Sequence, residues 1–291
     1  MKRLCFAFCA LLTVLCLAGC SPAVPPFDPF DTEEDGAESS PDREEAPLLP
    51  LLSLDGRRYS FTGDEEAITA KDDLLTIKEA GAYRLTGELT EGGLAVEVGW
   101  GETVRLILDG VSIRSSKRPA LSVISAAAVV VETAADSVNL LFSESHSVME
   151  ADTNLVLCGK GSLSLSGAKT AVRASGSLTM EDGTLRATAS EYGFLSEKRI
   201  EIRGGTAAVN AAKFGYATRE SSSLGGIFVY GGALTAVCSE AALSAHGMIL
   251  LAGGSGSFDC PAAYQCEHEG NGKAVKGTIL QTGGSFPPIP S

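Results

Sequence analysis

Hydrophobic and polar residues alternate in short runs along most of this chain after residue 50. Clear examples are VRLILDGVSI at 104–113 and GSLSLSG at 161–167, and turn-forming residues lie between such runs. Alternation of this kind is typical of β-strands that bury one face, whereas the 3.6-residue periodicity of an amphipathic helix is hard to find. The pattern predicts an all-β protein.

The predicted strands recur at a constant spacing in the second half of the chain. Glycines that precede a strand follow one another at intervals of 22, 22, 27 and 22 residues, and five inserted residues, ESSSL at 220–224, account for the longer interval. A fixed period of this length marks a repeat architecture in which each unit stacks on the last. The glycines are Gly161, Gly183, Gly205, Gly232 and Gly254.

Aligning the repeats on these glycines produces five columns that we expect to point inward. At a strand spacing of about 4.8 Å, such columns form a continuous core. We therefore predict a single right-handed parallel β-helix with coils of about 22 residues, although an antiparallel sandwich of the same strands is an alternative. The columns begin at Val156, Cys158, Leu163, Leu165 and Val172, and the last of them ends at Gln265.

The phrase EYGF at 191–194 returns as KFGY at 213–216 with the opposite charge. We expect the glycine to make a turn and the final aromatic residue, Phe194 or Tyr216, to point into the core. Tyr192 and Phe214 then stack at a corner, where aromatic rings either bind sugar or cover a thin edge of the core. The residues before them form a charge ladder that favours correct coil register: Lys169, Glu191, Lys213 and Glu240.

The N-terminus has the order of a secretory signal peptide. Lys2 and Arg3 precede an apolar run, which is followed by Leu17, Ala18, Gly19 and Cys20. These last four residues resemble the lipobox of bacterial lipoproteins, so we expect a signal peptide at 1–19 and a lipid on Cys20. This order predicts an exported protein that is anchored to the cell membrane and faces the exterior.

Acidic residues concentrate just after the predicted cleavage site. Residues 21–50 hold nine acids against one base, which accounts for −8 of the formal net charge of −13. A segment of this composition, rich also in proline and serine, predicts a disordered tether at 20–50. The remaining 51–291 form the predicted β-helix domain, whose mildly acidic charge argues against nucleic acid as a partner.

Three phrases in the first half resemble a known family. They are TIKEAGAYRLTGEL at 76–89, VRLILDGVSIRSS at 104–116 and VVVETAADSVNLL at 129–141. Their order is similar to the opening of the bacterial carbohydrate-binding β-helix domains that bind cellulose and pectin-type polysaccharides, often with calcium. The resemblance implies a polysaccharide partner. It also implies calcium ligands at the corner column, but that column holds no acid: Thr170, Tyr192, Phe214, Ala241 and Ala263.

The resemblance favours a monomeric, non-catalytic, cell-surface polysaccharide-binding lipoprotein. We take Tyr192, Phe214 and the turn residue Trp100 as candidate sugar contacts, with Glu191 and Lys213 beside them; Trp100 could instead pack over the N-terminal coils. No metal site is predicted. A β-helix lyase or hydrolase is one alternative, but its paired carboxylates or base are not evident, and Arg173 and Arg219 have no predicted acidic neighbours. A structural or adhesion role in the envelope is another alternative.

Four cysteines remain outside the predicted signal peptide and lipid anchor. Cys238 and Cys260 share a column on neighbouring coils, at a separation that a disulfide tolerates. A Cys260–Cys266 pair or free thiols are the alternatives. Cys158 is expected to be a core thiol.

Overall fold

The computed structural model describes residues 49–220, 225–270 and 273–290; the side chains of 268–274 are not described. Residues 47–291 form one compact unit. The predicted anchor Cys20, the tether up to residue 48 and most of the insertion at 220–224 lie outside the described residues. Among the residues described, no helix is long and apolar enough to cross a membrane.

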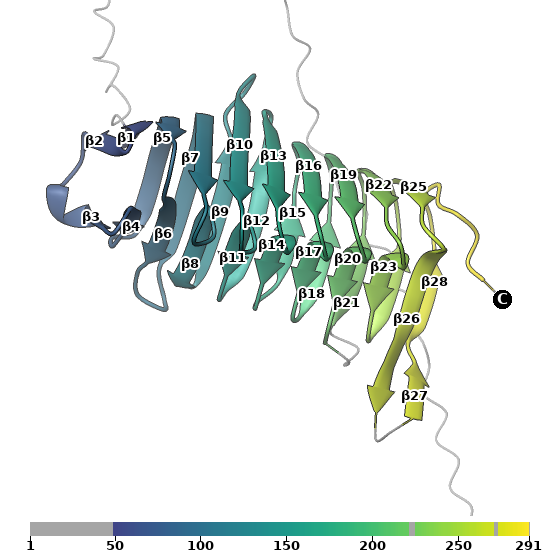
Figure 1. Cartoon of the computed structure of the whole chain (residues 1–291). Helices are drawn as coiled ribbons and strands as arrows, with labels where there is room; N and C mark the ends of the chain where they lie inside the picture. The colour runs from purple at the N-terminus through teal and green to yellow at the C-terminus, as the bar shows by residue number, and fades with distance from the viewer. Residues whose placement is uncertain (1–48, 221–224, 271–272, 291) are drawn as a thin grey trace, which may run out of the picture. The chain divides into compact units, whose positions relative to one another are not determined.

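The compact unit is a parallel β-helix whose strands stack into three faces (Figure 1), which confirms the predicted fold class. Face 1 consists of β1 (Leu51–Gly56), β5 (Gly81–Leu89), β7 (Thr103–Ser115), β10 (Val138–Ser143), β13 (Ser162–Gly167), β16 (Thr184–Ala189), β19 (Thr206–Ala211), β22 (Ala233–Val237) and β25 (Ser255–Asp259).

Face 2 begins with the first halves of β5 and β7, which bend and join it to face 1. It continues through β9 (Ala128–Thr133), β12 (Asn154–Gly159), β15 (Leu178–Met180), β18 (Arg199–Ile202), β21 (Gly226–Val229), β24 (Met248–Leu251) and β28 (Thr278–Gln281).

Face 3 is a separate sheet. It contains β3 (Ile68–Lys71), β4 (Leu74–Ile77), β6 (Gly93–Glu97), β8 (Leu121–Ser125), β11 (Met149–Ala151), β14 (Thr170–Ala174), β17 (Tyr192–Ser196), β20 (Phe214–Thr218), β23 (Ala241–Ala245), β26 (Ala262–Gly270) and β27 (Lys273–Lys276).

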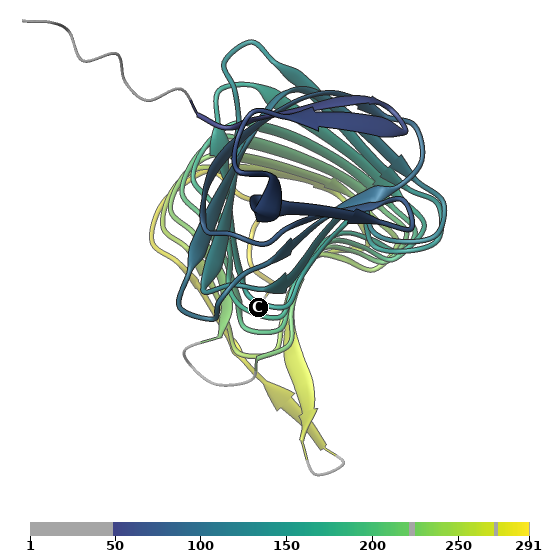
Figure 2. The same cartoon turned by 90° about the vertical axis from the view of Figure 1, so that its left-hand side faces the viewer.

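Antiparallel hairpins occur at both ends of the stack. At the N-terminal end, β2 (Arg58–Phe61) pairs with β1, and β3 pairs with β4 after a short 3-10 helix, Glu65–Ala67. At the other end, β26 pairs with β27 in a hairpin that projects beyond the coils. Figure 2 views the stack from its N-terminal end, with the coils superposed.

The inward columns make one continuous hydrophobic core. The aromatic pair Phe194 and Tyr216 is fully buried, with ring centroids 5.1 Å apart and nearly parallel planes. The Tyr216 hydroxyl donates to the Ala207 carbonyl at 3.0 Å, so burial of this phenol leaves no polar group unsatisfied. The core role predicted for both aromatic residues is confirmed.

The predicted column containing Cys158 is wrong by one residue. Leu157, not Cys158, lies in register with Met180. The chain from Leu157 to Gly161 is one residue longer than the equivalent segment of the next coil, so the column shifts. Val156 turns outward for the same reason, and Cys158 is partly exposed rather than a core thiol.

The columns also shift in the last coil. Tyr264, not Gln265, continues the inward column, and Ala262, not Ala263, continues the corner column. The corner between Asp259 and Ala262 is one residue shorter than in the coil before it. A constant period therefore misplaced both positions.

The glycines of EYGF and KFGY do not make turns. Neither Gly193 nor Gly215 has a positive φ angle. A Cβ atom on Gly193 would lie 2.2 Å from Val209 Cγ1, and one on Gly215 would lie 2.7 Å from the Ala242 carbonyl oxygen. The glycine is repeated because a side chain at this point of face 3 would collide with the strands of face 1 and with the backbone of the next coil.

Candidate functional site

Strand β10 exposes the residue types that a strand normally buries. Its outward side chains are Val138, Leu140 and Phe142, which we call the apolar strip. Val138 is 64% exposed, Leu140 is 48% exposed and Phe142 is half-buried. Its inward positions include Asn139 and Ser143, both fully buried. A one-residue slip would bury the apolar set, so the observed register requires an explanation.

Hydrogen bonds of the two buried polar residues fix this register. The Asn139 Oδ1 atom accepts from the Val111 amide at 2.9 Å, and its Nδ2 donates to Ser137 Oγ and to the Ser162 carbonyl at 2.8 and 3.1 Å. Ser143 Oγ donates to the Arg118 carbonyl at 2.9 Å. Burying either group without these partners would cost free energy. The strip therefore faces solvent because Asn139 and Ser143 must face inward.

The apolar strip lies between a guanidinium group and rows of hydroxyl groups. Arg114 on β7 stacks over the Phe142 ring, with Cζ 4.5 Å from the ring centroid. On the other side, β13 presents only serines outward, and β16 follows with two threonines and one arginine. The outward side chains of β13 and β16 are Ser162, Ser164, Ser166, Thr184, Arg186 and Thr188.

Arg114 and Arg186 differ from most arginines on the other faces. Neither takes part in an ion pair among the described residues, whereas Arg105 pairs with Glu132 and Arg203 pairs with Glu181 and Glu201. Three strand spacings, about 14 Å along the axis, separate β7 from β16. Both guanidinium groups are therefore free to donate to an incoming oxygen-rich ligand.

Tyr192 and Phe214 stack at the corner in register, as the repeat predicts. Their ring centroids are 5.5 Å apart and their planes differ by 15°. Because the stacking direction follows the helix axis, each ring covers one face of the other and turns its edge toward solvent. Arg219 Cζ also lies 5.9 Å from the centroid of the Tyr192 ring. The pair therefore offers a glycan less ring face than the sequence suggested.

The charge ladder also stacks as expected. Successive coils are joined by hydrogen bonds from the Glu191, Lys213 and Glu240 amides to the preceding member's carbonyl. Lys213 Nζ lies 3.7 Å from Glu191 Oε1. Both side chains are exposed, so this pair adds little stability.

Trp100 lies in the turn between β6 and β7 and is 73% exposed. The alternative that it packs over the N-terminal coils is wrong. It remains a candidate sugar contact because its indole is largely open to solvent.

The corner column does not fit a calcium ion. Thr170, Tyr192, Phe214 and Ala241 lie in register, and none carries a carboxylate. Calcium prefers several oxygen ligands, mainly carboxylates and carbonyls. In the part of the chain that the structure describes, no group of three or more His, Cys, Asp or Glu side chains is arranged to hold a metal ion.

Cys238 and Cys260 form a disulfide between neighbouring coils, with their Cα atoms 4.9 Å apart. Cys158 and Cys266 are free and partly buried. Burial raises the pKa of both free thiols. Since the thiolate is the reactive form, neither thiol has the character of a nucleophile.

The expectation that Arg173 and Arg219 lack acidic neighbours is wrong. Arg173 contacts Glu150 at 2.6 Å and Glu197 at 3.6 Å, and Arg219 contacts Glu197 at 3.3 Å. Burial alone would lower the pKa of Arg173, but hydrogen bonding and charge from Glu150 and Glu197 outweigh it and raise the pKa. Arg173 is held as a cation in a structural network, which does not suit a catalytic base.

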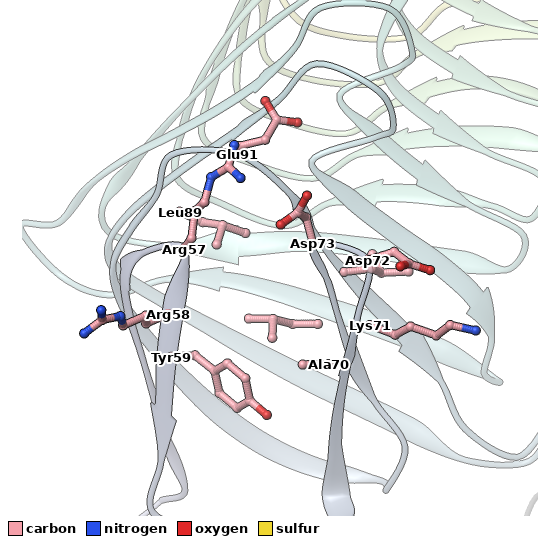
Figure 3. Close-up of a pocket in the computed structure, with 11 residues that line it drawn as sticks. Arg57, Arg58, Tyr59, Ala70, Lys71, Asp72, Asp73, Leu89 and Glu91 are labelled. Atoms are coloured by element: carbon pink, nitrogen blue, oxygen red, sulfur yellow. The ribbon is translucent and has the colours of Figure 1, made fainter.

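A concave feature, which we call the end pocket, lies at the N-terminal end of the stack (Figure 3). Its volume is about 190 Å³, and it lies between the β1–β2 and β3–β4 hairpins. Leucines form part of its lining, and charged residues of both signs surround it. The charged residues are Arg57, Arg58, Lys71, Asp72, Asp73 and Glu91.

Sequence reasoning missed both the apolar strip and the end pocket. The strip could have been found, because VNLL belongs to the family-like phrase and its polar Asn139 alternates with Val138 and Leu140. If Asn139 is assigned to the buried side of the strand, alternation places Val138 and Leu140 on the solvent side. The pocket had no comparable signal, since it depends on how two hairpins are placed on either side of it.

Comparison with known proteins agrees with the fold. A family model described as carbohydrate-binding domain-containing protein matches residues 71–283. A solved structure described as a polysaccharide lyase-like protein from C. thermocellum, in a gadolinium derivative, superposes with a TM-score of 0.62 at 17% identity. That match covers 82% of this chain and 97% of that one, and at this identity it shows the fold alone. No curated protein matches the chain. The family model covers most of the β-helix, so the chain belongs to the carbohydrate-binding domain-containing protein family.

Proposed function

We propose that this protein binds an extracellular polysaccharide on face 1 and does not cleave it. The observation that carries the proposal is the exposed apolar strip, which folding does not require to be apolar. Val138, Leu140 and Phe142 offer surface to the apolar face of sugar rings. The neighbouring hydroxyl rows supply donors and acceptors for sugar hydroxyl groups.

The two unpaired guanidinium groups extend the same surface. Arg114 and Arg186 lie on either side of the strip and the serine row. A guanidinium group donates several hydrogen bonds in a fixed plane and binds carboxylates with two of them. The surface therefore suits both neutral glycans and glycans that carry carboxylates. Trp100, Tyr192 and Phe214, with Glu191 and Lys213, are additional candidate contacts at the corners.

We also propose that the domain is exported and held at the membrane by a lipid on Cys20. The order of Lys2, Arg3, the apolar run and the small residues before Cys20 supports this placement. An acidic tether between anchor and domain would let the β-helix reach a polymer outside the cell. Mass spectrometry of the mature N-terminus tests this part separately: diacylglyceryl-Cys20 is expected, and an unmodified residue elsewhere would contradict it.

The test of binding is retention of the compact unit, residues 47–291, on insoluble or immobilised cellulose, polygalacturonate and xylan. Retention on at least one polymer is expected, with no sugar released. Failure to bind any polymer would exclude the proposal and favour a structural or adhesion role. Release of unsaturated or shortened products would instead show a lyase or hydrolase.

A further inference from the structure

The end pocket is lined by residues at the tips of two hairpins. Gly56 and Arg57 form the tip of the β1–β2 hairpin, and Asp72 and Asp73 form the tip of the β3–β4 hairpin. Leu89, from the end of β5, contributes apolar lining. In Figure 3, Arg57 and Asp73 turn their charged groups toward the same end of the pocket, near Glu91.

The aspartate turn carries backbone strain at the rim of the pocket. Asp72 and Asp73 have φ angles of 52° and 59°. A two-residue hairpin loop with positive φ at both positions is a type I′ turn, for which Asn-Gly is the preferred sequence. Among the described non-glycine residues, only these two and Asp136 have positive φ. An Asn-Gly pair would make the same turn with less strain, so the turn itself does not require the two carboxylates.

The charged groups at the rim are available to a ligand. Neither Arg57 nor Asp73 forms an ion pair among the described residues, whereas Glu91 accepts from the Ser116 amide and hydroxyl at 3.1 and 3.0 Å. Those bonds to Ser116 lower the pKa of Glu91 despite some burial. The rim thus combines a free guanidinium donor, a free carboxylate acceptor and an anchored second carboxylate.

The pocket continues the surface of the apolar strip. Gly56 on β1 pairs with Leu89 on β5, and Leu89 pairs with Ile113 on β7. Continuing this register places Arg57, Thr90 and Arg114 in one outward column, with Phe142 next. Two strand spacings, about 10 Å, therefore separate the backbone of Arg57 from that of Arg114.

We propose that the end pocket holds the terminal sugar ring of a chain whose following rings lie on the apolar strip. This inference rests on the proposed function. A volume of about 190 Å³ is smaller than the roughly 300–1,000 Å³ of pockets for drug-sized ligands, so it suits one ring. Asp73 accepts hydrogen bonds from ring hydroxyls, Arg57 donates to ring or carboxylate oxygens, and Leu89 packs against carbon atoms of the ring.

The double substitution D72N/D73G in the full chain tests the inference. It removes both carboxylates and supplies the Asn-Gly pair that a type I′ turn prefers, so the hairpin is retained. The variant should melt at the same or a higher temperature than the wild type. Asp136→Gly is the matched control, because it relieves a similar φ angle outside the pocket.

Binding is measured by calorimetry with the polymer that the wild type retains and with short oligosaccharides prepared from it. Because oligosaccharides are rich in chain ends, D72N/D73G should bind them at least about tenfold more weakly, the effect of losing one charge-assisted hydrogen bond. Its polymer affinity should stay within about twofold, and Asp136→Gly should match the wild type for both ligands.

Equal oligosaccharide binding by wild type and D72N/D73G, with polymer still bound, would overturn the end pocket and leave the proposed function standing. A wild type that binds neither polymer nor oligosaccharide would overturn the proposed function, and this inference with it. The two failures are therefore distinguished by the polymer measurement on the wild type.

Discussion

Single side chains in this protein carry roles that their residue types alone do not reveal. Phe142 and Phe194 are both phenylalanines on β-strands, but Phe194 fills the core and Phe142 faces solvent beside Arg114. The difference arises from the parity of their positions along the strand. The residue type indicates which contacts a side chain can make, and its position along the strand determines whether it faces the core or solvent.

Glu91 allows a pH test at this scale. The hydrogen bonds that Glu91 accepts from Ser116 lower its pKa from the unfolded-state value of 4.5. The ionised carboxylate therefore stabilises the folded state fully above pH 4.5, and this stabilisation is lost as pH falls through the lower pKa of the folded state. Because Glu91 is partly exposed, we expect Glu91→Gln to cost no more than about 1 kcal/mol near neutral pH. Melting temperatures from pH 7 to pH 3 measure this.

The difference in melting temperature between the wild type and Glu91→Gln should disappear as the solution becomes acidic. A difference that is independent of pH would show that the ionised carboxylate does not contribute.

At the scale of elements, β10 is defined by its two buried polar residues. Asn139 joins three segments, since it bonds to Val111, Ser137 and Ser162. The apolar strip keeps its orientation only while these bonds hold. In the proposed function, the inward side of β10 stabilises the fold and its outward side contacts the glycan.

Asn139→Ala is expected to destabilise the protein by about 3 kcal/mol, because it leaves the buried Val111 amide without its acceptor and opens a small cavity. Chemical denaturation measures the loss. Asn210→Ala is the matched control: this asparagine lies at an exposed outward position on β19, and its loss should be nearly neutral. Equal effects of the two substitutions would contradict the role given to Asn139.

Much of the element pattern could be predicted from the sequence. The repeat columns that start at Leu163 and Leu165 fall in register throughout, because glycine spacing and strand alternation agree there. The misplaced residues, Cys158 and Gln265, lie next to corners of a different length, which a constant period cannot detect. The end pocket could not be predicted, because it depends on how two hairpins are placed on either side of it.

At the scale of the whole molecule, the β-helix is a nearly one-dimensional stack in which each coil contacts its neighbours. Such stacks are stabilised locally, and their ends need protection. The β1–β2 and β3–β4 hairpins lie at the N-terminal end, and Phe286 and Ile289 of the C-terminal segment pack against the core at the other end. The Cys238–Cys260 disulfide ties two of the last coils together.

Replacing both bridged cysteines by serine should therefore affect the C-terminal coils most. For a loop with a sequence separation of 22 residues, the loss is about 3 kcal/mol. Hydrogen exchange should show faster opening of β21 to β25 and unchanged protection of β5 to β10. Cys158→Ser is the control and should change neither region, whereas uniform loss of protection would contradict a local role.

The central claim is that the apolar strip is retained for binding and not for folding. The most direct measurement compares retention of the wild type, L140S/F142S and the corner variant Y192A/F214A on the polymer that the wild type binds, together with their melting temperatures. If the strip binds the glycan, L140S/F142S keeps its melting temperature and loses retention, while Y192A/F214A keeps most of its retention. Full retention by L140S/F142S would show that the strip is not the binding surface, and unfolding of that variant would show that the strip is needed for folding.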